Sequence, residues 1–185
     1  MRGGSKRKAG RQSRGGDSGK GLVSQLSASL AALLMAAATA HADAPIFGEV
    51  ESVVTGNSFV LGGRRHRLWG IDAPDLDQPC VNGNGEAYAC GTTAKILLFT
   101  VTRRQPLACR AVGVPQQGPP LVTCTLGGYD LGALMVASGY AFDDAAVSGG
   151  AYARWEGDAK AERQGMWGGP FVKPADWRRG RLGLR

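Results

Sequence analysis

Residues 67–75 read RLWGIDAPD, and this stretch directs the interpretation of the whole chain. It overlaps a run from Arg64 to Ile71 in which side chains of different character alternate, which predicts a strand that carries Arg67. Asp72 and Asp75 follow directly after this strand. Carboxylate oxygens bind hard cations, and the guanidinium fork binds phosphate oxygens. An arginine and two carboxylates near one strand end therefore suit a place where a metal ion and a phosphodiester meet.

Short strands and helices are predicted on both sides of this stretch. Further strands are expected over Ile46–Val54, Phe59–Leu61, Leu107–Val112 and Leu121–Leu126. Apolar residues at helical spacing predict a helix over Glu86–Val101. A capping Asp130 and a closing Gly139 predict another over Leu131–Ser138, and a third is expected over Tyr152–Arg163, before Gly165. Three strands, a helix, two strands and then helices is the order of a Greek-key barrel of the oligonucleotide-binding (OB) type. The sequence thus predicts an α+β fold, with a five-stranded OB-type barrel and about three helices.

The first 42 residues have the composition of an export signal. A basic, Gly- and Ser-rich stretch precedes an apolar run from Leu26 to Ala40, and small residues follow at Ala40 and Ala42. This order predicts a signal peptide that is cleaved near Ala42, and hence a periplasmic or secreted protein. The alternative is a transmembrane anchor, although the apolar run is shorter than the ~20 residues that a span needs.

The predicted leader also carries most of the positive charge. Residues 1–42 contain seven Lys/Arg and one Asp, so 15 basic and 14 acidic residues remain of the 22 and 15 in the whole chain. The chain from Asp43 onward is therefore nearly neutral, and its net charge says little about nucleic acid. A basic C-terminal tail, residues 178–185, is expected to be solvated and disordered. The predicted domain accordingly spans residues 43–177.

The cysteines indicate disulfide bonds. All four lie after the predicted leader, at Cys80, Cys90, Cys109 and Cys124. An even number of cysteines in an exported chain favours disulfides, for which three pairings are possible. Cys109 and Cys124 lie symmetrically about a turn-rich stretch, so we favour the pairs Cys80–Cys90 and Cys109–Cys124. Zinc is the less favoured alternative, because the chain has no C-x-x-C pair.

Five segments, in order, resemble the thermonuclease family, which is also called staphylococcal-nuclease-like. They are RLWGIDAPD (67–75), YACG (88–91), YDLGALMVASGYA (129–141), YARWEGDAKAERQGMW (152–167) and FVKPADWRR (171–179). The closest likeness is to exported Gram-negative members. The resemblance implies a nuclease that hydrolyses phosphodiesters of single-stranded DNA or RNA with Ca²⁺. It implies Arg67 as a catalytic phosphate clamp and Asp72 as a calcium ligand.

Three positions depart from the family's pattern. Asn57 stands where the family has a calcium-binding aspartate, and its amide oxygen can bind the metal but carries no charge. Asp75 aligns with the general-base glutamate but is one methylene shorter, and a displacement of about 1 Å can cost about 100-fold in rate. Pro119 takes the place of a second clamping arginine, and proline offers no donor. Arg110 would substitute for that arginine only if the hairpin folds back.

Two classes of function remain open. One is a nuclease that these departures weaken, in which Arg67 and Asp75 act on the substrate while Asp72 and Asn57 hold calcium. The other is a non-catalytic OB-fold module that binds an oligonucleotide, a polysaccharide or an envelope protein. Three of these residues also have a plain structural explanation, with Arg67 as an exposed strand residue and Asp72 and Asn57 as turn formers. We expect a monomer without stable membrane insertion once the leader is removed.

Overall fold

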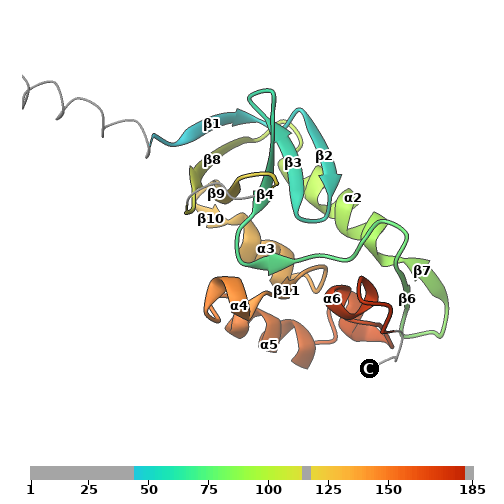
Figure 1. The fold of residues 1–185 in the computed structure, drawn as a ribbon. Coiled ribbons are helices and arrows are strands. Elements are labelled where there is room, and N and C mark those ends of the chain that lie inside the picture. Colours follow the sequence, from blue (N-terminus) through green and yellow to red (C-terminus); the bar gives the residue numbers. More distant parts are fainter. Residues whose placement is uncertain (1–43, 114–117, 182–185) are drawn as a thin grey trace, which may run out of the picture. The chain divides into compact units, whose positions relative to one another are not determined.

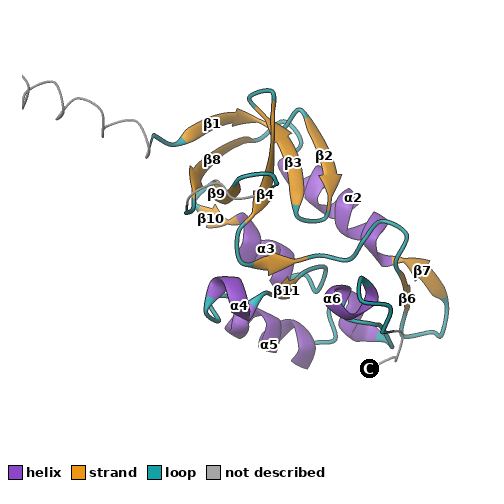
Figure 2. Cartoon of the chain, in the orientation of Figure 1, coloured by secondary structure: helices purple, strands orange, loops and turns teal. Residues whose placement is uncertain are grey.

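The computed structural model describes residues 44–113 and 118–181, and their architecture is α+β, as predicted (Figure 1, Figure 2). A large sheet lies beside α2, and the later helices gather below it in the view of Figure 1. The predicted signal peptide, residues 1–42, lies outside the described residues, as do residues 182–185 of the predicted tail.

The large sheet has the strand order β1-β8-β9-β4-β3-β2, and β10 pairs with β9 outside this path. Its strands are β1 (Ile46–Glu49), β2 (Ser52–Thr55), β3 (Ser58–Leu61), β4 (Arg64–Leu68), β8 (Pro106–Ala111), β9 (Leu121–Leu126) and β10 (Tyr129–Asp130). All neighbouring strands are antiparallel except β4 and β9, which run parallel. The predicted strand over Ile46–Val54 is split, because its first half pairs with β8 and its second half with β3.

The sheet does not close into a hydrogen-bonded barrel within the described residues. Its two edges are β1 and β2, and these strands do not pair with each other in residues 44–113 and 118–181. Only Val50 and Glu51 separate them in the chain. The backbone N–H of Glu51 donates to the carbonyl of Val60 at 3.0 Å, which extends the pairing of β2 with β3. The two edges are therefore joined by a bend in the chain instead of by a ladder.

Both predicted disulfides are present. Cys109 and Cys124 face each other across the β8–β9 ladder, with 4.0 Å between their Cα atoms. Cys80 lies on β6 (Pro79–Val81) and bonds to Cys90, which directly follows β7 (Ala87–Ala89). Both bridges are of the kind found in oxidising, non-cytoplasmic compartments.

The helices differ from the prediction in extent and number. The expected helix over Glu86–Val101 begins four residues later, as α2 (Cys90–Thr102), because Ala87–Ala89 pairs with β6 instead. The predicted helices over Leu131–Ser138 and Tyr152–Arg163 correspond to α3 (Leu131–Ala137) and α5 (Ala153–Ala161). Two further helices of four residues each were not predicted: α4 (Ala145–Ser148) and α6 (Pro174–Trp177). A short 3-10 helix, η2, covers Gly165–Gly168.

Two clusters of buried side chains hold the domain together. The larger one lies between the sheet, α2 and α3, and Phe59, Leu98 and Leu107 have no exposed surface in it. The smaller one surrounds the Cys80–Cys90 bridge and contains Phe142, Met166 and Phe171. Through Met166 and Phe171, this second cluster packs the C-terminal segment against the rest of the domain. The position of that segment matters for the site described below.

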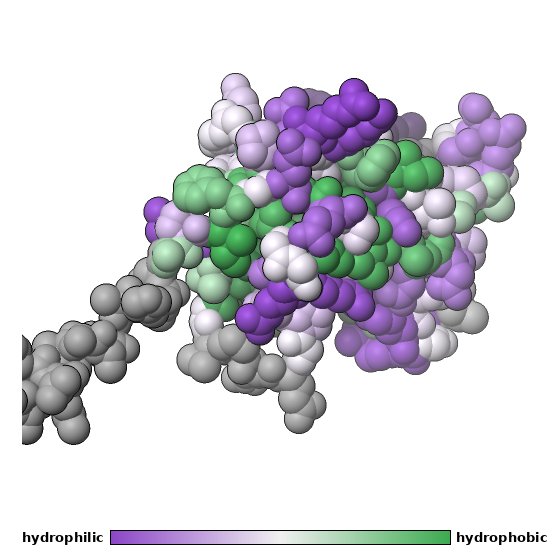
Figure 3. Space-filling model, turned by 90° about the horizontal axis from the view of Figure 1, so that it is seen from above, coloured by the Kyte–Doolittle hydropathy of each residue, from purple (hydrophilic) through white to green (hydrophobic). Residues whose placement is uncertain are grey.

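The surface mixes apolar and polar side chains. On the face in Figure 3, hydrophobic areas in the middle are bordered by hydrophilic side chains. The most exposed large apolar side chains of the described residues include Phe47 on β1 and Ile96 and Phe99 on α2. Scattered apolar side chains of this kind are ordinary on protein surfaces. Within the described part of the chain, no helix is both long and apolar enough to span a membrane.

Candidate anion-binding pocket

A turn at Gly70 brings both ends of the RLWGIDAPD stretch to one place. Gly70 has a φ of 72°, in the left-handed region that favours glycine. A Cβ atom at this position would lie 2.9 Å from the Cβ atom of Ser148 and 3.0 Å from the ring of Tyr152. Space and backbone conformation therefore both require glycine. The turn ends β4 and starts β5 (Ile71–Asp72), which pairs with β11 (Phe142–Asp143).

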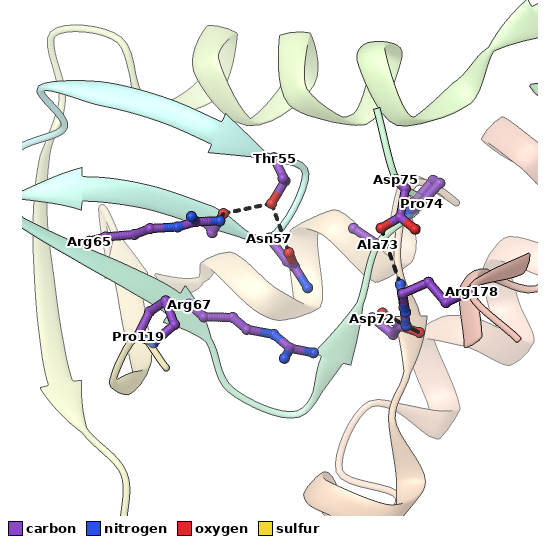
Figure 4. A pocket seen from close by; sticks show the side chains of 11 residues that line it. Thr55, Asn57, Arg65, Arg67, Asp72, Ala73, Pro74, Asp75, Pro119 and Arg178 are labelled. Carbon is purple, nitrogen blue, oxygen red and sulfur yellow. Dashed lines mark hydrogen bonds and ion pairs between the residues drawn. The ribbon is translucent and has the colours of Figure 1, made fainter. Parts of the chain in front are cut away.

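The pocket at this turn has a volume of about 320 Å³ and is lined by charged and polar side chains from four parts of the chain (Figure 4). Its lining residues are Thr55, Asn57, Ser58, Arg65, Arg67, Asp72, Ala73, Pro74, Asp75, Pro119 and Arg178. All four predicted site residues are thus brought together, with Pro119 beside them. Three arginines and two aspartates leave the pocket with one formal positive charge.

Asp72 and Asp75 are bridged by Arg178, a residue that the sequence analysis placed in a free tail. Nη2 of Arg178 donates to both carboxylate oxygens of Asp72, at 2.8 and 2.6 Å. Its Nη1 points to Oδ1 of Asp75 at 3.4 Å, which makes a weaker, mainly electrostatic contact. Arg178 lies 103 residues after Asp75 and 106 residues after Asp72 in the chain. The expectation of a disordered tail is therefore wrong for Arg178.

Burial and charge act in opposite directions at this ion pair. Burial raises the pKa of Asp72 above its usual 3.8, and the guanidinium groups of Arg178 and Arg67 offset only part of that increase. Burial alone would lower the pKa of Arg178, but its bonds to Asp72 and the charge of Asp75 raise it. Desolvation thus dominates at the carboxylate, and the acidic neighbours dominate at the guanidinium, which stays charged.

Arg67 extends into the pocket from β4, and Arg65 lies two residues before it on the same strand (Figure 4). Nη2 of Arg65 donates to the hydroxyl of Ser58 at 3.3 Å. Among the described residues, no hydrogen bond or ion pair engages the guanidinium of Arg67. Its charge nevertheless lowers the pKa of Asp72. Arg67 therefore has its full set of donors available for a ligand in the pocket.

Asn57 is held in a tight turn between β2 and β3. A Cβ atom at the preceding Gly56 would lie only 2.6 Å from the Cβ atom of Ala94, so the turn packs directly on α2. The amide nitrogen of Asn57 donates to the carbonyl of Ile71 at 3.3 Å. Its amide oxygen accepts from the hydroxyl of Thr55 at 3.0 Å (Figure 4). Asn57 is thus at the pocket, but with its oxygen turned towards its own turn.

The donor set does not fit the calcium site that the resemblance implies. Both oxygens of Asp72 accept from Arg178, and the oxygen of Asn57 accepts from Thr55. Within the described residues, no group of three or more His, Cys, Asp or Glu side chains is placed to hold a metal ion. A guanidinium group therefore sits at the carboxylates where a calcium ion was expected.

The other polar and aromatic residues considered in the sequence lie elsewhere. Arg110 pairs in register with Thr123 on the β8–β9 ladder and does not line the pocket. Phe142 is buried in the smaller core cluster. His66 is buried as well, and its Nε2 contacts the carbonyl of Leu61 at 3.2 Å. Each of these residues serves packing or the sheet in this structure.

Sequence reasoning missed Arg178 and Arg65 as pocket residues. A signal for Arg178 was present in the segment FVKPADWRR. Proline is favoured at the first turn of a helix, and Pro174 begins α6 in the structure. A helix that ends directly before the arginines argues against a free tail. No local pattern, however, pairs Arg178 with Asp72.

Comparisons with known proteins give one informative likeness. No protein-family model matches the chain. The chain is 33% identical over 144 residues to the "Succinoglycan biosynthesis protein ExoI" of Rhizobium meliloti (strain 1021). The alignment covers 77% of this chain and 74% of that protein. The name of this relative states no activity, so the likeness to thermonucleases stays a prediction.

Proposed function

This chain belongs to the family of the succinoglycan biosynthesis protein ExoI, and from this premise we propose that it is an exported, thermonuclease-like protein that binds single-stranded nucleic acid. Its pocket holds the phosphodiester backbone through Arg67 and Arg65, and any hydrolysis is strongly weakened. One observation carries this proposal. The guanidinium of Arg67 extends into a pocket with net positive charge and is not engaged by any described residue.

The proposed fold is an OB-type barrel. The support is the bend at Val50 and Glu51, which makes the two edges of the sheet consecutive segments of one chain. The parallel pairing of β4 with β9 further supports the proposal. It joins two strands that are not consecutive in the chain, as the Greek-key order predicted from the sequence requires. The proposed periplasmic or secreted location rests on the predicted leader and on the two disulfides.

Arginine is suited to the proposed ligand. A planar guanidinium group can donate two parallel hydrogen bonds to phosphate oxygens. Arg67 is half-buried, so a phosphate bound there is partly shielded from water, and electrostatic attraction is stronger than on an open surface. Arg65 is exposed and adds charge that attracts the backbone over a longer range.

Hydrolysis is expected to be weak for two reasons. Pro119 lines the pocket at the position where the family's pattern has a second arginine, and loss of one such donor costs roughly 100- to 1,000-fold. Asp75 is one methylene shorter than the family's glutamate, and a displacement of about 1 Å can cost about 100-fold in rate; its Oδ1 is also in contact with Arg178 at 3.4 Å. If these two losses act separately, the deficit reaches about 10⁴-fold or more.

Binding and cutting can be measured on the same sample. The oxidised chain from Asp43 onward contains the whole compact unit of residues 43–185. Binding of a fluorescent single-stranded oligonucleotide is followed by anisotropy at several salt concentrations, and cutting by gel electrophoresis with calcium or with chelator. Arg67→Ala should weaken binding and lower the slope of log K against log salt by about 1.

The matched control is Arg64→Ala. Arg64 is an exposed residue of the same strand, and it does not line the pocket. Equal affinities of wild type and Arg67→Ala, with both proteins folded, would refute binding at this pocket. Calcium-dependent cutting at the rate of an efficient nuclease, lost in Arg67→Ala, would show that the enzyme is not weakened.

A second candidate ligand is a polysaccharide, and it is favoured by the name of the relative, a succinoglycan biosynthesis protein. A polysaccharide with acidic groups would meet the same positive pocket as a phosphate backbone. Competition separates the two candidates. An acidic polysaccharide that displaces the oligonucleotide at lower concentration than unlabelled DNA would favour the polysaccharide.

A further inference from the structure

We propose that the side chain of Arg178 is the built-in cation of this pocket, standing in the place that the resemblance assigns to calcium. It holds the two carboxylates together and offers positive charge to an anionic ligand without a metal ion. The proposal deepens the proposed function and rests on it for the identity of the ligand. The exclusion of calcium by Arg178 is independent of that ligand.

The contacts of Arg178 are those of a bridging cation. One guanidinium group reaches both oxygens of Asp72 at 2.8 and 2.6 Å and Oδ1 of Asp75 at 3.4 Å (Figure 4). A divalent ion between these carboxylates would need the same oxygens. Calcium can therefore enter only if Arg178 leaves, and the ion pair with Asp72 competes with it.

Arg178 reaches the site from a seated segment of the chain. It directly follows α6, whose first residue, Pro174, is buried. Just before α6, the carbonyl of Val172 accepts a hydrogen bond of 2.7 Å from the buried side chain of Gln78. After it, the side chains of Arg179 and Arg181 both pair with Asp176, at 3.2 and 3.3 Å. The bond from Gln78 and the burial of Pro174 thus fix the segment before Arg178 to the domain, and the two pairs with Asp176 hold the turn after it.

Arg178 keeps donors for a ligand after binding the two aspartates. A guanidinium group has five N–H donors. Nη2 is directed at Asp72, and Nη1 is directed at Asp75. Nε and the second hydrogen of Nη1 are not needed for these contacts. The side chain is 40% exposed and lines the same pocket as Arg67, so a phosphate group between the two arginines can accept from both.

The test compares the oxidised chain from Asp43 onward with two variants, Arg178→Ala and Arg179→Ala. Arg179 is the adjacent arginine, and it pairs with Asp176 instead of with the pocket. The first measurement is the melting temperature in chelator, in about 10 mM calcium chloride, and in sodium chloride of equal ionic strength. A site with a Kd of about 10⁻⁴–10⁻³ M would raise the melting temperature by roughly 3–8 °C at this concentration.

Wild type and Arg179→Ala should show no calcium-dependent rise. Arg178→Ala should gain one, because the oxygens of Asp72 and Asp75 are released. The proposal would be overturned if calcium raised the melting temperature of the wild type as much as that of Arg178→Ala. It would also be overturned if calcium raised the melting temperature of neither protein. If Arg178→Ala fails to fold, the same melting measurement is made on Arg178→Gln, which is neutral but can still donate to Asp72.

The second measurement is oligonucleotide binding in chelator, at a fixed salt concentration. Arg178→Ala should weaken this metal-free binding by at least about 10-fold, while Arg179→Ala changes it by less than about 3-fold. Equal losses in the two variants would mean that Arg178 contributes only general charge, against the proposal. Failure of the wild type to bind any oligonucleotide would refute the proposed ligand, and the calcium measurement would still decide the role of Arg178.

Discussion

Replacing Gly91 with alanine should lower the unfolding free energy of the domain, because it displaces the loop that carries Asp75. Gly91 lies in the first turn of α2, and a Cβ atom there would be 1.8 Å from the carbonyl oxygen of Asp75 and 2.9 Å from the nitrogen of Leu76. Ordinary contact begins near 3.4 Å, so the peptide would have to move by about 1.6 Å. The clashing atoms are backbone atoms, which cannot rotate away. The same carbonyl accepts the N–H of Gln78 at 2.9 Å, and this bond would be strained too.

The expected loss in unfolding free energy is about 2 kcal/mol. Overpacking of a buried site typically costs about 1–3 kcal/mol, and the change from glycine to alanine in a helix returns at most about 1 kcal/mol. The same substitution at Gly157, in α5, is the control, because a Cβ atom there meets nothing within 4 Å. Gly157→Ala should stabilise the protein by about 0.5–1 kcal/mol.

Thermal melting in chelator checks both variants. Gly91→Ala should melt about 4–8 °C below the wild type, and Gly157→Ala slightly above it. Equal melting temperatures for the two variants would refute the close contact between α2 and the Asp75 loop on which this reasoning depends.

Three further predictions concern the ion pair, a disulfide and a buried tyrosine. Burial raises the pKa of Asp72 in the folded protein above 3.8, so between the unfolded-state and folded-state pKa values the folded protein keeps a proton that the unfolded chain loses. The unfolding free energy of wild type relative to Asp72→Asn should therefore fall as pH rises through this range. A relative gain in denaturant titrations would contradict this. Replacing Cys109 and Cys124 with serine opens a loop of 15 residues and should cost about 3 kcal/mol in unfolding free energy, measured by denaturant titration. Tyr152→Phe removes a hydroxyl that donates to Asp130, the cap of α3, at 3.3 Å, and should cost about 1 kcal/mol in the same assay, whereas a neutral result would mean that water replaces this bond.

Local patterns predicted much of the fold. Turn residues on either side located β3, β8 and β9, and a capping Asp130 with terminal glycines located α3 and α5 to within about two residues. The pairing Cys109–Cys124 followed from symmetry about a turn, because a hairpin brings facing residues together regardless of how it packs on the rest of the protein. The error at the start of α2 lies where strand pairing overrides local preference. Residues 87–89 look helical in sequence but pair with β6, next to the Cys80–Cys90 bridge.

By itself, the sequence indicated the α+β class, favoured the disulfide pairs that the structure contains, and placed Arg67, Asp72 and Asp75 near one strand end, because these features depend on spacing along one short stretch or one hairpin. Only the tertiary structure decided what those carboxylates bind. Arg178 lies 106 residues after Asp72, and no periodicity or motif connects them. The contact exists because the smaller core cluster seats the segment that ends in α6 against β5 and its neighbours. Burial of apolar side chains outside the pocket thus sets the charge inside it.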